Sequence, residues 1–144
     1  MNIIWGVILF IISSIGYFGQ AITAFLPGTA TKLGLTEPEA DVDRTFYADV
    51  RGEALWDTAI LWTLPVAGVL LVLNSPAWVY FGLVGGGMFL YFAGRGIVVR
   101  RLMQRRGIRI GTPETLKIIY IFLSLWGLAA IITIVLAIAA LPLT

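Results

Sequence analysis

The stretch "TLPVAGVLLVLNSPAWVYFGLVGGGMFL", Thr63–Leu90, contains no charged residue, and at its middle stands the polar triplet Asn74–Pro76. An α-helix needs about 20 mostly apolar residues to cross the roughly 30 Å hydrocarbon core of a bilayer. Asn, Ser and Pro in succession are typical of a tight turn. The stretch therefore predicts two apolar helices that fold back on each other around Ser75 and form a transmembrane hairpin.

The composition extends this prediction to the whole chain. Only 12% of the 144 residues are charged, against roughly 25% in an average soluble domain, and the mean hydropathy is +0.93. Four segments are long and apolar enough to span a membrane. We therefore predict an all-α membrane protein, a four-transmembrane-helix bundle in one domain over residues 1–144, with helices at about 3–26, 54–73, 77–99 and 116–141.

Two polar loops, residues 27–52 and 100–115, connect these segments. Pro27 ends the first helix, and Thr112 followed by Pro113 is typical of a helix N-terminus. Within the first loop, a cap at Thr36 and apolar residues on one face over 46–50 predict a short interfacial helix.

The charges predict an orientation. With four crossings the two loops lie on the same side, and all ten Lys and Arg residues fall in those loops or within a turn or two of them. Positively charged loops stay in the cytoplasm. We therefore expect both loops to be cytoplasmic and both termini extracytoplasmic, in a bacterial or archaeal plasma membrane.

The chain has no cysteine and no histidine. This excludes disulfides, thiolate–metal sites, His-ligated haem or chlorophyll, and a Ser-His-Asp triad. We expect no cofactor and no metal, and we leave bound lipid open. The arginines of the second loop predict contact with lipid headgroups rather than with nucleic acid; they are Arg100, Arg101, Arg105, Arg106 and Arg109.

Arg95 lies inside the third apolar segment and needs a partner, because an unpaired charge in a bilayer is costly. Asp57 stands 18 residues before Ser75 and Arg95 stands 20 after it. At 1.5 Å per residue their depths differ by about 3 Å. The spacing predicts an Arg95–Asp57 ion pair, with Glu53 on the same helix face but nearer the water.

The other helices offer polar groups at a similar depth. We predict a cluster of Gln20, Glu53, Asp57 and Arg95, with Tyr17 and Tyr120 near it. This cluster has two interpretations: it ties the helices together, or it binds a ligand or a proton. The glycine pair Gly82 and Gly86 predicts close helix packing, within the bundle or between copies of the chain.

Several motifs together resemble the DoxX-like group of small four-helix bacterial membrane proteins. The first helix ends in "FLPGTATKLGL", the second opens with "YADVRGEALWD", and a Gly-Arg in the third helix leads to "RRLMQRRG". The resemblance implies a four-helix fold and no established substrate. The resemblance implies that the residues of this chain at the group's motif positions are Arg51 and Arg95.

The chain is also similar in architecture to the membrane-associated glutathione and eicosanoid enzymes. That resemblance implies trimers that bind glutathione near the cytoplasmic face, and "RGEALWD" resembles their second helix, which carries arginine and glutamate. The chain departs from them at the characteristic asparagine, because Leu55 and Trp56 stand in that region.

We expect a non-enzymatic accessory or scaffold protein, or a subunit of a larger membrane complex, whose partners are lipids, other subunits or further copies of itself. The alternative is a membrane enzyme or carrier that binds an anionic or amphipathic small molecule, in the manner of a glutathione transferase, at the polar cluster. A proton-coupled transporter is the weakest hypothesis, since Glu53 and Asp57 both lie near one interface.

Overall fold

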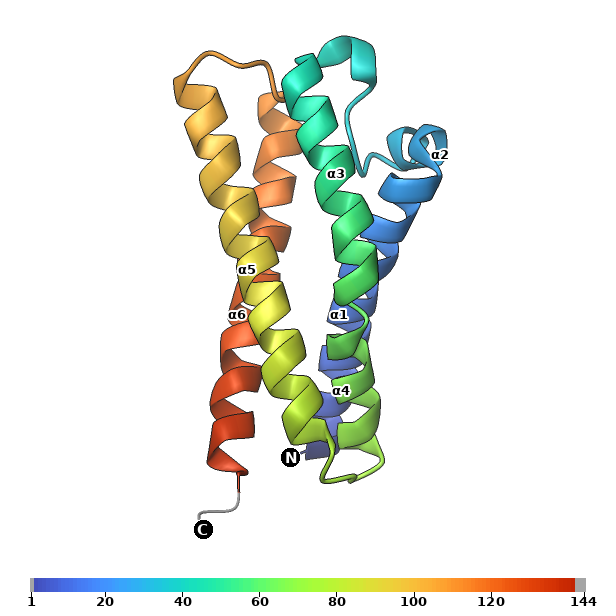
Figure 1. Ribbon diagram of the computed structural model, residues 1–144, viewed down its shortest axis with the longest axis vertical. Helices are drawn as coiled ribbons and strands as arrows, with labels where there is room; N and C mark the ends of the chain where they lie inside the picture. Colours follow the sequence, from blue (N-terminus) through green and yellow to red (C-terminus); the bar gives the residue numbers. More distant parts are fainter. Residues whose placement is uncertain (1, 142–144) are drawn as a thin grey trace.

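Four long helices run antiparallel in the computed structural model, which describes residues 2–141 (Figure 1). The first span is α1 (Asn2–Phe25), followed by the short α2 (Pro27–Lys32) and the 3₁₀ turn η1 (Glu39–Asp41). The second span combines α3 (Arg44–Ile60) and α4 (Thr63–Val72), the third is α5 (Trp78–Arg105), and the fourth is α6 (Pro113–Ala139). All four are long and apolar enough to cross a membrane, so the chain is a small four-pass integral membrane protein.

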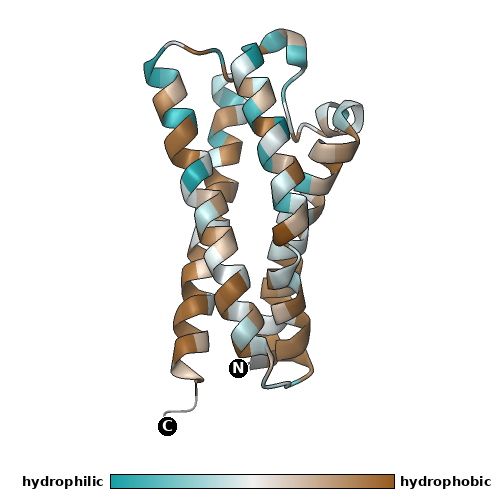
Figure 2. Cartoon of the chain, viewed as in Figure 1, coloured by the Kyte–Doolittle hydropathy of each residue, from teal (hydrophilic) through white to brown (hydrophobic). Residues whose placement is uncertain are grey.

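The two ends of the bundle differ in polarity. The connections over residues 26–43 and 106–112 lie at one end, which we call the charged end together with the helix turns that adjoin them (Figure 1). The turn between α4 and α5 lies at the other end with the start of α1 and the end of α6, and we call this the hairpin end. Hydrophilic residues gather at the charged end (Figure 2).

The predicted hairpin turn is confirmed. Asn74 adopts a positive φ of 52°, and the Ser75 amide donates to the Leu70 carbonyl at 2.9 Å, so the chain reverses directly between α4 and α5. Close packing supports the reversal: a Cβ added to Gly85 of α5 would lie 2.6 Å from the backbone nitrogen of Leu64 in α4. Gly68 of α4 approaches the backbone of Phe10 in α1 in the same way.

The second span begins earlier than predicted, at Arg44 rather than near residue 54. The Asp43 side chain accepts a hydrogen bond from the Thr45 amide at 2.8 Å and so caps α3. Phe46 packs against Ile110 of the other connection and Leu116 of α6, which anchors the added turns to the rest of the bundle. The predicted interfacial helix with a Thr36 cap is therefore wrong: residues 46–50 are the first turns of α3.

The second span also bends. Leu61 and Trp62 separate α3 from α4, and Pro65 follows. Proline has no amide hydrogen to donate to the carbonyl four residues earlier, and its ring clashes with that carbonyl. The carbonyl in question belongs to Leu61, so the position of Pro65 explains the bend.

The remaining helix bounds shift by a few residues. Helix α5 continues to Arg105 instead of ending at 99, and Gly107, with a φ of 71°, terminates it. The Ile108 amide donates to the Met103 carbonyl at 3.0 Å, which is the hydrogen bond of a Schellman C-cap. The N-cap predicted at Thr112 is confirmed, and α6 starts at Pro113 instead of 116.

Helix packing is uneven along the bundle. Helix α1 packs along α3 and α4, helix α5 packs along α6, and α4 joins the two pairs near the hairpin end. Toward the charged end α3 and α5 hardly touch. Gly82 and Gly86 of α5 face Thr133 and Ile134 of α6, so this glycine pair serves packing inside the bundle.

Candidate functional site

Arg95 forms two ion pairs across the space between α5 and α3. Its Nη2 atom donates to Asp49 Oδ1 at 2.6 Å, and its Nη1 atom lies 2.8 Å from Glu53 Oε1. The Glu53 side chain is 7% exposed, whereas Arg95 and Asp49 are each about a quarter exposed. The long arginine side chain thus joins two helices whose backbones are far apart at this end.

The predicted Arg95–Asp57 pair is wrong. Asp49, Glu53 and Asp57 follow each other at intervals of four residues on α3, and each interval rotates the side chain by about 40° around the helix axis. Asp57 is therefore turned by about 80° relative to Asp49. The second span is also not a straight rod, because it bends at Leu61–Trp62.

Asp57 remains inside the bundle without a counter-ion of its own. The residue is 2% exposed, and its Oδ2 atom is buried and has no hydrogen-bond partner within residues 2–141. The charged groups near enough to act on it are Glu53 and Arg95, which already bind each other. Asp57 is thus the most isolated of the three acids.

The structure does not bring the other predicted members to Arg95. Tyr17 packs against the apolar core and sets its ring edge-on to Phe18, 5.3 Å away. Tyr120 faces the outer side of α5 and α6, where its hydroxyl donates to Gln104 Oε1 at 2.9 Å. Gln20 lines a separate pocket. The predicted cluster is therefore divided among four places: the ion pairs of Arg95, the apolar core, the outer side of α5 and α6, and the pocket that Gln20 lines.

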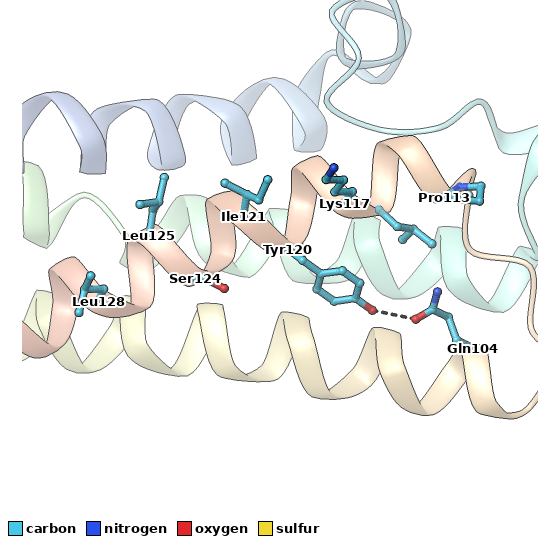
Figure 3. Close-up of a pocket in the computed structure, with 10 residues that line it drawn as sticks. Gln104, Pro113, Lys117, Tyr120, Ile121, Ser124, Leu125 and Leu128 are labelled. Atoms are coloured by element: carbon cyan, nitrogen blue, oxygen red, sulfur yellow. Dashed lines mark hydrogen bonds between the residues drawn. The ribbon is translucent and has the colours of Figure 1, made fainter.

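One of these places is a groove along α6, with a volume of about 810 Å³, which we call the α6 groove (Figure 3). At its charged end lie Lys117, Gln104 and Tyr120, and the Arg101 guanidinium covers the Tyr120 ring at 5.8 Å. Toward the hairpin end it becomes apolar and exposed, at Ile121, Leu125 and Leu128. The groove thus combines a cationic, hydrogen-bonding end with a lipid-compatible wall.

A second place is a cavity of about 160 Å³ between α1 and α6, which we call the inter-helix pocket. Arg100 of α5 reaches into it, although this arginine was predicted to contact lipid headgroups. Its Nη1 atom donates to the Gly96 carbonyl at 3.1 Å, and its guanidinium lies 5.7 Å from the centre of the Phe46 ring. Arg101, Arg105, Arg106 and Arg109 are exposed, as contact with headgroups requires.

The two connections at the charged end are fastened to each other. The Asp43 amide donates to the Arg109 carbonyl at 2.8 Å, and Glu37 Oε1 accepts from the Thr112 amide at 3.1 Å. These bonds hold the start of α3 against the start of α6. They hold Phe46, at the start of α3, next to the guanidinium of Arg100.

Sequence reasoning missed Asp49, Gln104 and Lys117. A signal for Asp49 exists, because it precedes Glu53 by one helical turn, but the predicted helix began after it. Lys117 was counted only among the ten basic residues that predict the orientation, and Gln104 lies on α5 beyond the predicted end of that helix. Among residues 2–141, no group of three or more acidic side chains is placed to hold a metal ion.

Compared with protein-family models, with curated proteins and with solved structures, the chain matches none of them.

Proposed function

We propose that this four-span protein binds anionic phospholipid at the α6 groove and acts in the membrane as a non-enzymatic accessory or scaffold protein. The observation that supports the proposal is the polarity of the groove: Lys117 and Gln104 stand at its charged end, and exposed apolar side chains continue along α6. A phospholipid has the same division, with its headgroup next to its acyl chains. Lys117 attracts the headgroup phosphate, and Ile121 and Leu125 contact the chains.

The location that we propose is the plasma membrane of a bacterium or archaeon, with the charged end in the cytoplasm. The exposed arginines of α5 and of residues 106–109 support it, because positive charge is retained on the cytoplasmic side. Anionic lipids of that leaflet then meet the cationic end of the groove.

The lipid proposal predicts a preference for charge. The purified protein in detergent is titrated with phosphatidylglycerol or phosphatidylcholine of equal chain length, and native mass spectrometry counts the bound lipid. We expect phosphatidylglycerol to bind more tightly, and Lys117→Gln to weaken it by about fivefold, because one basic residue contributes about 1 kcal/mol next to an anionic surface.

The chain supplies a matched control. Its two lysines are Lys32 and Lys117, and Lys32 lies at the end of α2, outside the α6 groove. Lys32→Gln should leave phosphatidylglycerol binding unchanged. An equal loss in both variants would mean that binding follows net charge, and the proposed site would be abandoned.

The scaffold part of the proposal is supported by the outer face of α5. Gly87 and Gly94 are exposed, and a Cβ added to either would meet nothing within 4 Å. They stand seven residues apart, on one side of the helix, and such small residues let a second helix approach closely. If a second helix packs on this face, the double substitution Gly87→Leu and Gly94→Leu should abolish the cross-link to a partner subunit or second copy in native membranes. Gly28→Leu, outside the spans, is the control.

The resemblances to the DoxX-like group and to the membrane-associated glutathione enzymes remain proposals. Membership of the DoxX-like group gains no support from the comparisons. The glutathione alternative places a charged ligand near Arg95, whose outer nitrogens both already contact acids. Retention of the protein on immobilised glutathione, with release by free glutathione, would revive that alternative.

A further inference from the structure

The inter-helix pocket is closed at one end, and its interior is empty of side chains. Trp126 closes it toward the hairpin end, where the indole Nε1 donates to the Ile12 carbonyl at 2.8 Å and the ring lies against Gly16. Nearer the charged end, a Cβ added to Gly19 would meet nothing within 4 Å. The pocket beside Gly19 is therefore space that no side chain fills.

Arg100 stands at the charged end of this space with unused hydrogen-bonding capacity. Its Nε atom is buried and has no hydrogen-bond partner in the described part of the chain. Both ion pairs found among residues 2–141 belong to Arg95, and Glu53, the acid whose charge acts most strongly on Arg100, is engaged there. A partly buried guanidinium without a carboxylate partner gains free energy when an anion joins it.

Gln20 adds a second donor on the opposite wall. It comes from α1 and lines the pocket together with Arg100, and no hydrogen bond to its side chain is found within the described residues. An amide and a guanidinium together offer donors to the two oxygens of one carboxylate. A phosphate has more oxygens and more charge to satisfy than this donor set provides.

The rest of the lining is apolar and narrow. Phe92, Phe122, Leu123 and Trp126 form the walls below the two polar side chains. The volume of about 160 Å³ is smaller than the roughly 300–1,000 Å³ of sites for drug-sized ligands. It holds the carboxyl group and the first few methylenes of one slender chain and is too small for two acyl chains or a tripeptide.

We propose that the inter-helix pocket binds a single-chain amphipathic carboxylate, a long-chain fatty acid. Its carboxylate bonds to Arg100 and Gln20, and its hydrocarbon chain runs between α1 and α6 toward Trp126. This site is separate from the α6 groove and does not depend on the phospholipid that we propose there.

Trp126 provides the readout, because bromine quenches indole fluorescence on contact. The full chain in detergent is titrated with a brominated long-chain fatty acid. We expect saturable quenching that disappears in Trp126→Phe, which identifies Trp126 among the five tryptophans. Gly19→Leu starts a side chain inside the pocket, where an added Cβ meets nothing within 4 Å, and should weaken binding at least tenfold. Gly52→Leu, which adds the same side chain at an exposed glycine on α3, should bind as the native chain does.

The contribution of charge to binding is tested on the protein, at Arg100, and on the fatty acid, at its carboxylate. Arg100→Gln should weaken binding about tenfold or more, since a hydrogen bond to a charged group contributes about 1.5–3 kcal/mol. If that variant does not fold, the brominated methyl ester replaces it, because the ester lacks the anion and should bind equally weakly. Lys117→Gln should not affect the fatty acid, so failure of the phospholipid site and failure of this site are distinguishable.

Three results would overturn the proposal. They are unchanged binding in Gly19→Leu, equal binding of acid and methyl ester, and equal saturable quenching by a brominated two-chain phospholipid. The last result would mean that the pocket is an ordinary lipid contact.

Discussion

Arg95 is the residue that connects α3 to α5 at the charged end. Its two ion pairs, at 2.6 and 2.8 Å, cross a region in which the two helices hardly touch. Glu53, at 7% exposed, depends on this arginine more than Asp49 does. The pairs therefore hold the charged end together, and Asp57 contributes no contact to them.

Removal of Arg95 should destabilise the fold. Arg95→Leu leaves Glu53 buried without a counter-ion, and we expect a loss of about 3 kcal/mol, the lower end of the range for breaking a buried ion pair. Unfolding by denaturing detergent measures the free energy. Arg105→Leu is the control, because Arg105 is exposed.

A pair of double-mutant cycles identifies the partner. Arg95→Leu combined with Glu53→Leu should recover part of the loss, because neither charge is then left alone. The cycle of Arg95 with Asp57→Leu should show little coupling. Strong coupling to Asp57 and none to Glu53 would contradict the observed geometry.

Helix α3 owes its first turns to a cap and to the packing of Phe46. Asp43 accepts from the Thr45 amide, and Phe46 packs against Ile110 and Leu116. These turns carry Asp49, so the cap supports one of the two partners of Arg95. The bend at Leu61–Trp62 then orients the whole element.

Loss of the cap should affect α3 alone. Asp43→Ala should cost about 1 kcal/mol, as helix caps of this type do. Hydrogen exchange should accelerate at the amides of residues 45–50 and remain unchanged in α6. Asp41→Ala is the matched control, because Asp41 lies in η1 and caps no helix. Equal acceleration in both variants would show that the cap has no role.

At the scale of the whole molecule, charge is separated along the bundle axis. Hydrophilic residues gather at the end that carries both long connections, and the hairpin end is apolar (Figure 2). Positive charge is retained in the cytoplasm during insertion. The whole bundle should therefore have a single orientation in the membrane.

Cysteine labelling tests this orientation cleanly, because the native chain has no cysteine. In intact cells or spheroplasts, a membrane-impermeant maleimide should label Ser75→Cys in the α4–α5 turn. Ala40→Cys, which is exposed in η1 at the charged end, should be labelled only after lysis. The reverse pattern would place the charged end outside and contradict the predicted orientation.

Features that depend on neighbouring residues were predictable from the sequence. The four apolar segments, the turn at Asn74–Pro76 and the cap at Thr112 are all present in the structure. Each depends on hydropathy, turn chemistry or capping within a few residues, so no knowledge of distant contacts is needed. Hydropathy alone placed the start of the second span too late, because the first turns of α3 are charged and are held by the packing of Phe46 against distant residues.

The tertiary structure alone decided which side chains meet. Arg95 binds Asp49 and Glu53 instead of Asp57, and Arg100 turns into the bundle instead of toward headgroups. Depth along the axis can be counted from the sequence, since each residue adds 1.5 Å. The rotation of a helix face, the bend at Leu61–Trp62 and the separation of α3 from α5 arise from packing between distant segments. Small changes in these quantities decide which acid an arginine reaches.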